Sequence, residues 1–97
     1  MTQQVIKPEI RHIPASRRFE LHAENQVATL DYTLDGDTIT FTHTLVPAEL
    51  EGRGIGSQLT HAGIEYAREH SYKVLSTCWF VTGYIERHKE YHHLLKS

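Results

Sequence analysis

This chain of 97 residues has little cysteine, little net charge and no long apolar run. Cys78 is the only cysteine, so no disulfide can form within the chain, which fits a reducing compartment. A formal net charge of -2 gives no electrostatic reason to expect nucleic acid as a partner. The apolar runs are all far shorter than a membrane-spanning helix requires, so no membrane partner is expected.

The length predicts a single domain, and the first residues do not look like a targeting signal. Residues 1–4 lack the basic and apolar regions of a signal peptide, so a cytoplasmic protein is expected. Residues 1–16 contain Pro8 and Pro14 and show no clear period, which predicts an N-terminal tail or a loosely docked arm. Residues 17–97 then form the folded domain.

Alternation of polar and apolar residues predicts three strands in the first half of the chain, over residues 18–23, 28–34 and 38–46. The dipeptide 35–36, Asp-Gly, is a strong hairpin signal between the second and third strands. The prediction is a three-stranded antiparallel meander. On the third strand, the residues expected on one face are Ile39, Phe41, His43 and Leu45.

The second half of the chain reads as helix, strand, helix. From Gly54 the apolar residues recur at three- and four-residue steps, which predicts an amphipathic helix ending near His70. Residues 73–76 form a short strand, and the strand–helix–strand order favours parallel pairing with the third strand. A second amphipathic helix is predicted from Cys78 to Tyr91. The fold class is α/β with a mixed sheet.

A glycine-rich turn joins the third strand to the first helix, with the sequence Gly52-Arg53-Gly54-Ile55-Gly56. Glycines permit positive φ, and the amides at a helix start can point together toward an anion. The turn therefore predicts a phosphate or pyrophosphate site. The alternative is an ordinary glycine turn whose amides face only water.

This arrangement resembles the acetyl-CoA-binding core of GNAT-type N-acetyltransferases. A closer resemblance, to a short GNAT-like subfamily without flanking arms, rests on two blocks. These are His43-Thr44 with Val46 and residues 49–56, and Cys78-Trp79-Phe80-Val81 with residues 84–88 and 90–91. The resemblance covers residues 17–95 and implies a minimal GNAT-like fold.

The resemblance implies that acetyl-CoA is the cosubstrate, with its pantetheine arm between strands 38–46 and 73–76. An amine would attack the thioester, and the coenzyme thiolate would leave. The implied coenzyme contacts are Val46, Arg53, Gly54, Ile55, Gly56, Ser57, Tyr84, Arg87 and His88. The acceptor is an amine of a protein or a small molecule, and a homodimer is a further expectation. The alternatives are a non-catalytic module that binds or senses acyl-CoA, and a small interaction domain without a ligand.

Three positions depart from the common GNAT pattern. Glu51 replaces an Arg or Gln before the first motif glycine. Cys78 replaces an Asn after the post-helix strand, and Ile85 occupies the position of a Tyr that often serves as general acid. The transfer chemistry of the common family therefore does not carry over unchanged.

Cys78 and His43 are the candidate catalytic residues. A thiol at a helix N-terminus has a lowered pKa, which suits a nucleophile or a group that contacts the thioester. The alternative for Cys78 is a small buried hydrophobe. His43 precedes the coenzyme loop and is a candidate general base for the incoming amine, or else a packed core histidine.

The remaining polar and aromatic clusters favour structural interpretations. Glu49 and Glu51 read as solvated turn residues. The pattern His-x-x-x-His-His at 88–93 supplies too few ligands for a typical zinc site, so no metal is expected. Trp79, Phe80 and Tyr84 are interpreted as core residues.

Overall fold

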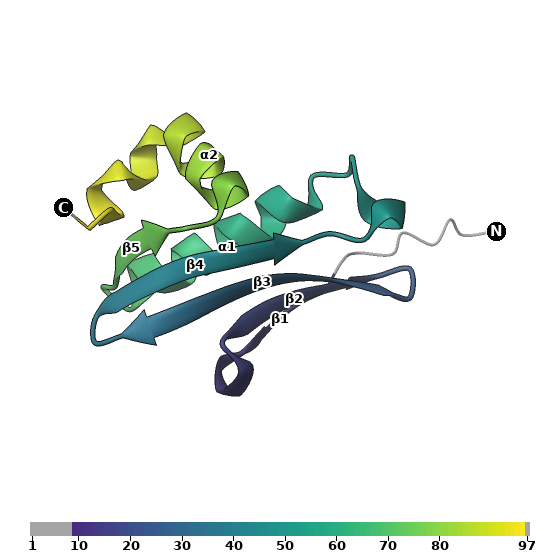
Figure 1. Ribbon diagram of the computed structural model, residues 1–97, viewed down its shortest axis with the longest axis horizontal. Coiled ribbons are helices and arrows are strands. Elements are labelled where there is room, and N and C mark those ends of the chain that lie inside the picture. The colour runs from purple at the N-terminus through teal and green to yellow at the C-terminus, as the bar shows by residue number, and fades with distance from the viewer. Residues whose placement is uncertain (1–8, 97) are drawn as a thin grey trace.

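In the computed structural model, residues 9–96 are described, and they form one mixed five-stranded sheet with two α-helices (Figure 1). The strands are β1 (Glu9–Ile13), β2 (Arg18–Ala23), β3 (Gln26–Asp35), β4 (Thr38–Leu45) and β5 (Lys73–Ser76). The α-helices are α1 (Ile55–Glu69) and α2 (Trp79–Arg87), and the 3₁₀ turns are η1 (Pro14–Ser16), η2 (Ala48–Leu50) and η3 (Lys89–Leu94). Strands β1 to β4 are antiparallel in chain order, and β5 pairs parallel to β4. The predicted mixed α/β fold is confirmed.

Strand β1 was not expected, because residues 1–16 had been interpreted as a tail or arm. Residues 9–13 pair with β2 in register, from Glu9 opposite His22 to Ile13 opposite Arg18. His12 explains the docking: its ring stacks on Phe19 at 4.1 Å and its Nε2 lies 2.7 Å from the Tyr32 hydroxyl. The antiparallel part therefore has four strands rather than three. Residues 14–16 form η1, and residues 1–8 of the predicted tail lie outside the described residues.

Helix α1 covers one face of the sheet and ends where the sequence predicts, with His70 as its C-cap. Gly63 allows the close approach, since a Cβ there would lie 2.8 Å from Phe41 Cε1 and 3.0 Å from Leu30 Cδ2. The fully buried side chains include Leu30, Ile39 and Phe41 of the sheet and Leu59 and Ile64 of α1. None of the helices among residues 9–96 is long and apolar enough to cross a bilayer.

A β-bulge in β4 reverses the predicted faces of the strand's second half. Opposite β3, Tyr32 pairs with Phe41 and Asp31 pairs with His43, so Thr42 is an extra residue without a counterpart. Because side chains alternate along a strand, one extra residue moves every later side chain to the other face. His43 is therefore exposed rather than sharing the buried face of Phe41, and that prediction was wrong.

The predicted second helix is shorter than the pattern suggested. α2 ends at Arg87, His88 leaves the helical region with φ -122 and ψ 80, and η3 follows. Two histidine rings satisfy carbonyls at this helix end: His88 Nδ1 donates to Tyr84 O at 2.7 Å, and His92 Nε2 donates to Ile85 O at 2.9 Å. Histidines 88 and 92 of the C-terminal motif thus act as caps.

Strands β4 and β5 pair over only the first half of β4. Paired residues run from Thr38 opposite Lys73 to Phe41 opposite Ser76, and Thr77 N still donates to Phe41 O at 3.0 Å. Beyond Phe41, β4 stays paired with β3 as far as Leu45 but has no partner on its other side, because β5 ends at Ser76 and the chain enters α2 (Figure 1). This leaves a gap beside the end of β4.

Candidate functional site

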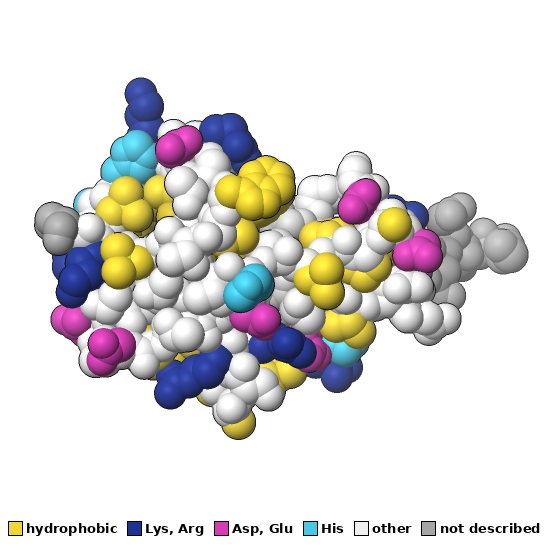
Figure 2. Space-filling view, in the orientation of Figure 1, with side chains coloured by type: hydrophobic (Ala, Val, Ile, Leu, Met, Phe, Trp, Pro, Cys, Tyr) yellow, Lys and Arg dark blue, Asp and Glu magenta, His cyan; other side chains and the backbone are white. Residues whose placement is uncertain are grey.

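A cavity of about 480 Å³ occupies the gap between the end of β4, the loop before α1 and the start of α2. Its lining residues are Thr44, Leu45, Val46, Leu50, Glu51, Gly52, Gly54, Ile55, Gly56, Ser57, Cys78, Trp79 and Phe80. Two of them are strongly exposed for apolar side chains, Leu45 at 65% and Trp79 at 85%. Figure 2 shows hydrophobic side chains on both sides of the notch at this place.

The loop wall of the cavity is shaped by two glycines with left-handed backbone, Gly52 at φ 80 and Gly54 at φ 74. Gly54 is the N-cap of α1, and the first intrahelical bond runs from Gln58 N to Gly54 O at 3.0 Å. The three amides before Gln58, those of residues 55–57, belong to the unpaired first turn of the helix. This wall therefore offers backbone donors and the positive end of a helix dipole to a ligand.

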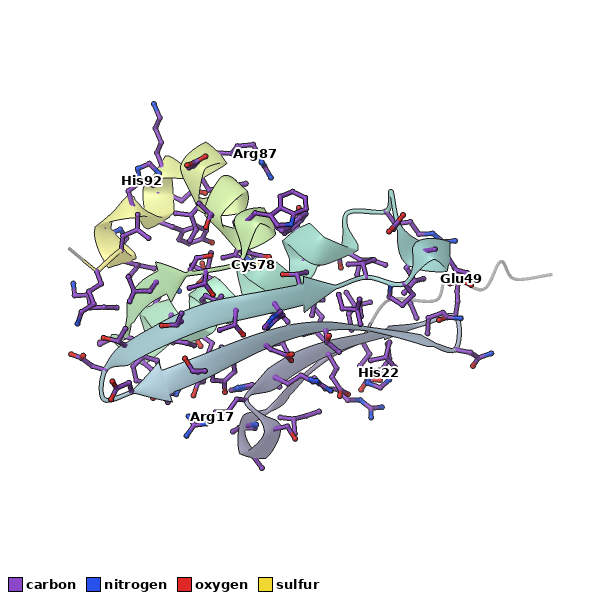
Figure 3. All side chains as sticks on the ribbon, viewed as in Figure 1. Arg17, His22, Glu49, Cys78, Arg87 and His92 are labelled. Atoms are coloured by element: carbon purple, nitrogen blue, oxygen red, sulfur yellow. The ribbon has the colours of Figure 1, made fainter. Side chains whose placement is uncertain are left out.

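The opposite wall carries Cys78, the N-cap of α2, where β5 hands over to the helix (Figure 3). Its sulfur lies 3.3 Å from the Thr44 hydroxyl across the gap. Burial alone would raise the pKa of the Cys78 thiol. Hydrogen bonding from Thr44 and from the first-turn amides of Val81 and Phe80 outweighs burial, so the pKa lies below its ordinary value.

Ser76 fixes the backbone that carries this thiol. Its hydroxyl donates to Cys78 O at 2.9 Å and accepts from Cys78 N at 3.2 Å. The Thr82 hydroxyl donates to Ser76 Oγ at 2.9 Å, which ties the turn to the first part of α2. The position of Cys78 relative to β4 is thus held by side-chain hydrogen bonds as well as by the strand.

Five residues of the predicted site lie away from this cavity. Arg53 pairs with Glu24 in the β2–β3 turn instead of facing the loop amides. Tyr84 is buried with its ring stacked on His88 at 3.9 Å. Arg87 lies at the far end of α2 from Cys78 (Figure 3), and His43 is on the open face beyond the bulge. The predicted Val46, Gly54, Ile55, Gly56, Ser57 and Cys78 do line it.

Sequence reasoning missed Thr44, Trp79 and Phe80 as lining residues. Thr44 turns toward Cys78 only because of the bulge, which the alternating pattern does not reveal. Trp79 had been interpreted as core, yet it is the first residue of α2 and faces solvent. Phe80 packs on the first turn of α1, since a Cβ on Gly56 would lie 2.7 Å from its Cζ atom.

The charge of the lining is sparse: Glu51 is its one ionisable side chain apart from Cys78. Among residues 9–96, no group of three or more His, Cys, Asp or Glu side chains is arranged to hold a metal ion. Any anion bound in the cavity would therefore depend on the loop amides rather than on a lysine or arginine of the lining.

Comparison with known proteins gives a consistent result. A family model described as GCN5-related N-acetyl-transferase matches residues 18–94. Protein NATD1 of Xenopus tropicalis is 31% identical over 80 residues, covering 79% of this chain and 73% of that protein. Human Protein NATD1 is also 31% identical over 80 residues, covering 79% and 71%. A solution structure of a GCN5-like N-acetyltransferase candidate from Staphylococcus aureus matches with a TM-score of 0.73 and 30% identity, covering 92% of this chain and 88% of that one.

Proposed function

Because the chain belongs to the GCN5-related N-acetyltransferase family, we propose that it transfers an acetyl group from acetyl-CoA to an amine. The observation that supports this most strongly is the single cavity lined by both the first turn of α1 and Cys78. One wall offers amides for a pyrophosphate, and the other offers a thiol of lowered pKa for a thioester. The wall formed by the first turn of α1 suits the pyrophosphate of acetyl-CoA, and the wall that carries Cys78 suits its thioester.

In this proposal the pyrophosphate binds the amides of residues 55–57, and the pantetheine arm runs along residues 44–46. Glycines at 52 and 54 let the loop present its backbone to the phosphates. Glu51 is unfavourable for an anion, and its exposure to solvent limits the cost because water screens the charge. The coenzyme sulfur then lies near Cys78.

The acceptor amine approaches from the open face of the sheet, opposite α1. Leu45 lies on that face, because it follows the bulge in step with His43, and it also lines the cavity. His43 is exposed on that same face, two residues before Leu45. His43 remains the proposed general base, now from the acceptor side rather than from within the core.

The reaction balances with these groups. His43 accepts a proton from the ammonium form of the acceptor, and the neutral nitrogen attacks the thioester carbon. The carbon–nitrogen bond forms, the carbon–sulfur bond breaks, and the coenzyme leaves as a thiolate. Cys78 donates its S–H to the developing thiolate, which a more acidic thiol does better. As the amide forms, the nitrogen loses its second proton to the Cys78 sulfur, which restores the thiol, and His43 releases its own proton to solvent.

A second candidate is a module that binds acyl-CoA without turnover. One observation favours it: among the lining residues of the cavity, Glu51 is the only conventional acid or base. If His43 does not serve the acceptor from the open face, the cavity holds no general base.

Turnover separates the two candidates. The protein is incubated with acetyl-CoA and a panel of small amines and lysine peptides, and free coenzyme thiol and acetylated product are measured together. An acetyltransferase releases thiol in proportion to acetylated amine. Tight binding of acetyl-CoA with no product from any amine would favour the binding module.

A Gly56 variant tests the loop. Gly56→Val is expected to weaken coenzyme A binding by more than tenfold, about 1.4 kcal/mol, because bulk at the first turn blocks approach to the amides. The new side chain also displaces Phe80. Calorimetry on Gly56→Val, Phe80→Ala and the double variant separates these causes. Rescue of affinity in the double variant would show that Phe80, and not the loop, carried the effect.

A further inference from the structure

Strand β1 is an open edge of the sheet. It lies at the opposite edge from β5 (Figure 1), and among residues 9–96 it pairs with β2 on one side and with no strand on the other. The β5 edge is partly covered, because Leu95 forms a bridge to Val74 and Lys96 N donates to Val74 O at 3.0 Å. The outward N–H and C=O groups of β1 can therefore pair with a further strand.

The two faces of β1 differ in chemical character. Ile10 lies opposite the fully buried Leu21, so its side chain is on the same face of the sheet as α1. It is 38% exposed there and lines a second cavity, of about 360 Å³, with four residues of α1, Ser57, Gln58, His61 and Ala62. On the open face, Arg11 donates to Glu9 at 3.2 Å, and both side chains are more than half exposed. The edge thus places an apolar residue between two opposite charges.

We propose that this edge is a homodimer interface, in which β1 pairs antiparallel with β1 of a second copy about a two-fold axis at Ile10. The two five-stranded sheets then join into one continuous sheet. A two-fold interface uses the same surface on both copies, so that surface must complement itself. The inference does not depend on the proposed function.

Symmetry and charge together select the register. Opposite residues must lie on the same face, so a two-fold axis perpendicular to the sheet has to pass through a residue and not between two residues. An axis at residue 9 would set the two Glu9 carboxylates against each other, and an axis at residue 11 would do the same with the two Arg11 side chains. Like charges directly opposite destabilise a strand pair. With the axis at residue 10, Glu9 of each copy faces Arg11 of the other.

The apolar side chains of the interface meet on the helix face. An axis at residue 10 sets the two Ile10 side chains opposite each other, with Cβ atoms about 4.5–5.5 Å apart. Helix α1 packs mostly on β2 and β3, so with strands spaced about 4.8 Å apart the two α1 axes lie about 19 Å from each other. Packed helices need only about 8–10 Å. The helices therefore do not collide, and each Ile10 helps to cover the apolar cavity beside the other.

The same features predict a weak dimer. Residues 9–11 are the described residues that pair across the axis, and Pro8, which precedes them, has no amide hydrogen to extend the ladder. The charged side chains are exposed, so salt screens their attraction. The dimer is therefore expected to form at high protein concentration and to weaken as salt concentration rises.

Sedimentation equilibrium of the full chain, at concentrations up to about 1 mM, tests the interface by charge reversal. Wild type is expected to show a monomer–dimer equilibrium. Glu9→Arg and Arg11→Glu should each raise its dissociation constant about tenfold or more, because each turns two cross-strand ion pairs into like-charge pairs. The double variant restores opposite charges across the axis, so its dissociation constant should return close to the wild-type value.

Lys73→Glu is the matched control, since it reverses an exposed charge on β5 and should leave the dissociation constant unchanged. A cysteine at the axis tests the register: in a Cys78→Ala background, Ile10→Cys should form a covalent dimer on oxidation, because opposite residues suit disulfide geometry. Leu75→Cys has similar exposure on the other edge, 40% against 38%, and should stay monomeric.

Three results would overturn the inference. The first is a chain that stays monomeric over the whole concentration range, which would leave the β1 edge to an extended segment of another protein. The second is a dimer that neither charge reversal weakens, because another surface would then form it. The third is a double variant no tighter than the single variants, because charge complementarity would then not set the pairing.

Discussion

Cys78→Ala is expected to lower the rate of acetyl transfer by about 10²–10⁴-fold, the usual range for a group that handles a proton in the transition state. Affinity for coenzyme A should change little, because the loop amides and not the thiol hold the pyrophosphate. The reason lies in the position of the sulfur, 3.3 Å from Thr44 across the gap, and in its lowered pKa. Steady-state kinetics and calorimetry on the same preparation measure both quantities.

Cys78→Ser defines what the thiol does. A hydroxyl keeps a hydrogen-bond donor, so a role in donating to the leaving thiolate predicts more residual activity in Cys78→Ser than in Cys78→Ala. A nucleophilic cysteine predicts equal and near-complete loss in both, together with an acetylated Cys78 in the wild type by mass spectrometry. Full activity in Cys78→Ala would remove the thiol from the mechanism.

His43→Gln is expected to lower kcat by about 10²–10⁴-fold while the melting temperature and coenzyme affinity stay near their wild-type values. His43 is exposed on the open face, so its loss leaves no cavity in the core.

His12→Gln is a useful comparison, because half-buried His12 stacks on Phe19 and bonds to Tyr32. It should lower the melting temperature without lowering kcat of the folded fraction. A His43→Gln protein with normal kcat would refute the base assignment. The acyl-CoA-binding module would then be the better account.

The sequence predicted the order of elements well because each of them has a strong local signal. The Asp35-Gly36 turn, the three- and four-residue period from Gly54 and the glycine loop all appear where expected. These features depend on backbone geometry and on the burial of one face of an element. Both leave a pattern in a short stretch of sequence. The loop and Cys78 line one cavity.

The errors arose where distant residues decide the structure. Thr42 looks like any other residue of an alternating strand. Only the register of β4 against β3 shows the bulge there, which places Thr44 rather than His43 on the same face as Phe41. Strand β1 depends on His12 contacts with Phe19 and Tyr32, which follow it in the chain. The end of α2 at Arg87 is a local exception: His88 and His92 bond to carbonyls four and seven residues before them, and the apolar periodicity does not reveal these contacts.

The central claim is that acetyl-CoA occupies the cavity with its thioester beside Cys78. Alkylation of the single cysteine of the unmodified chain tests it most directly, with the rate followed by intact-protein mass spectrometry. In the free protein, the labelling rate should level off at a lower pH than for an ordinary thiol, since the Cys78 pKa is lowered. Saturating acetyl-CoA is predicted to slow labelling severalfold or more at constant pH. Equal rates with and without saturating acetyl-CoA would contradict the account.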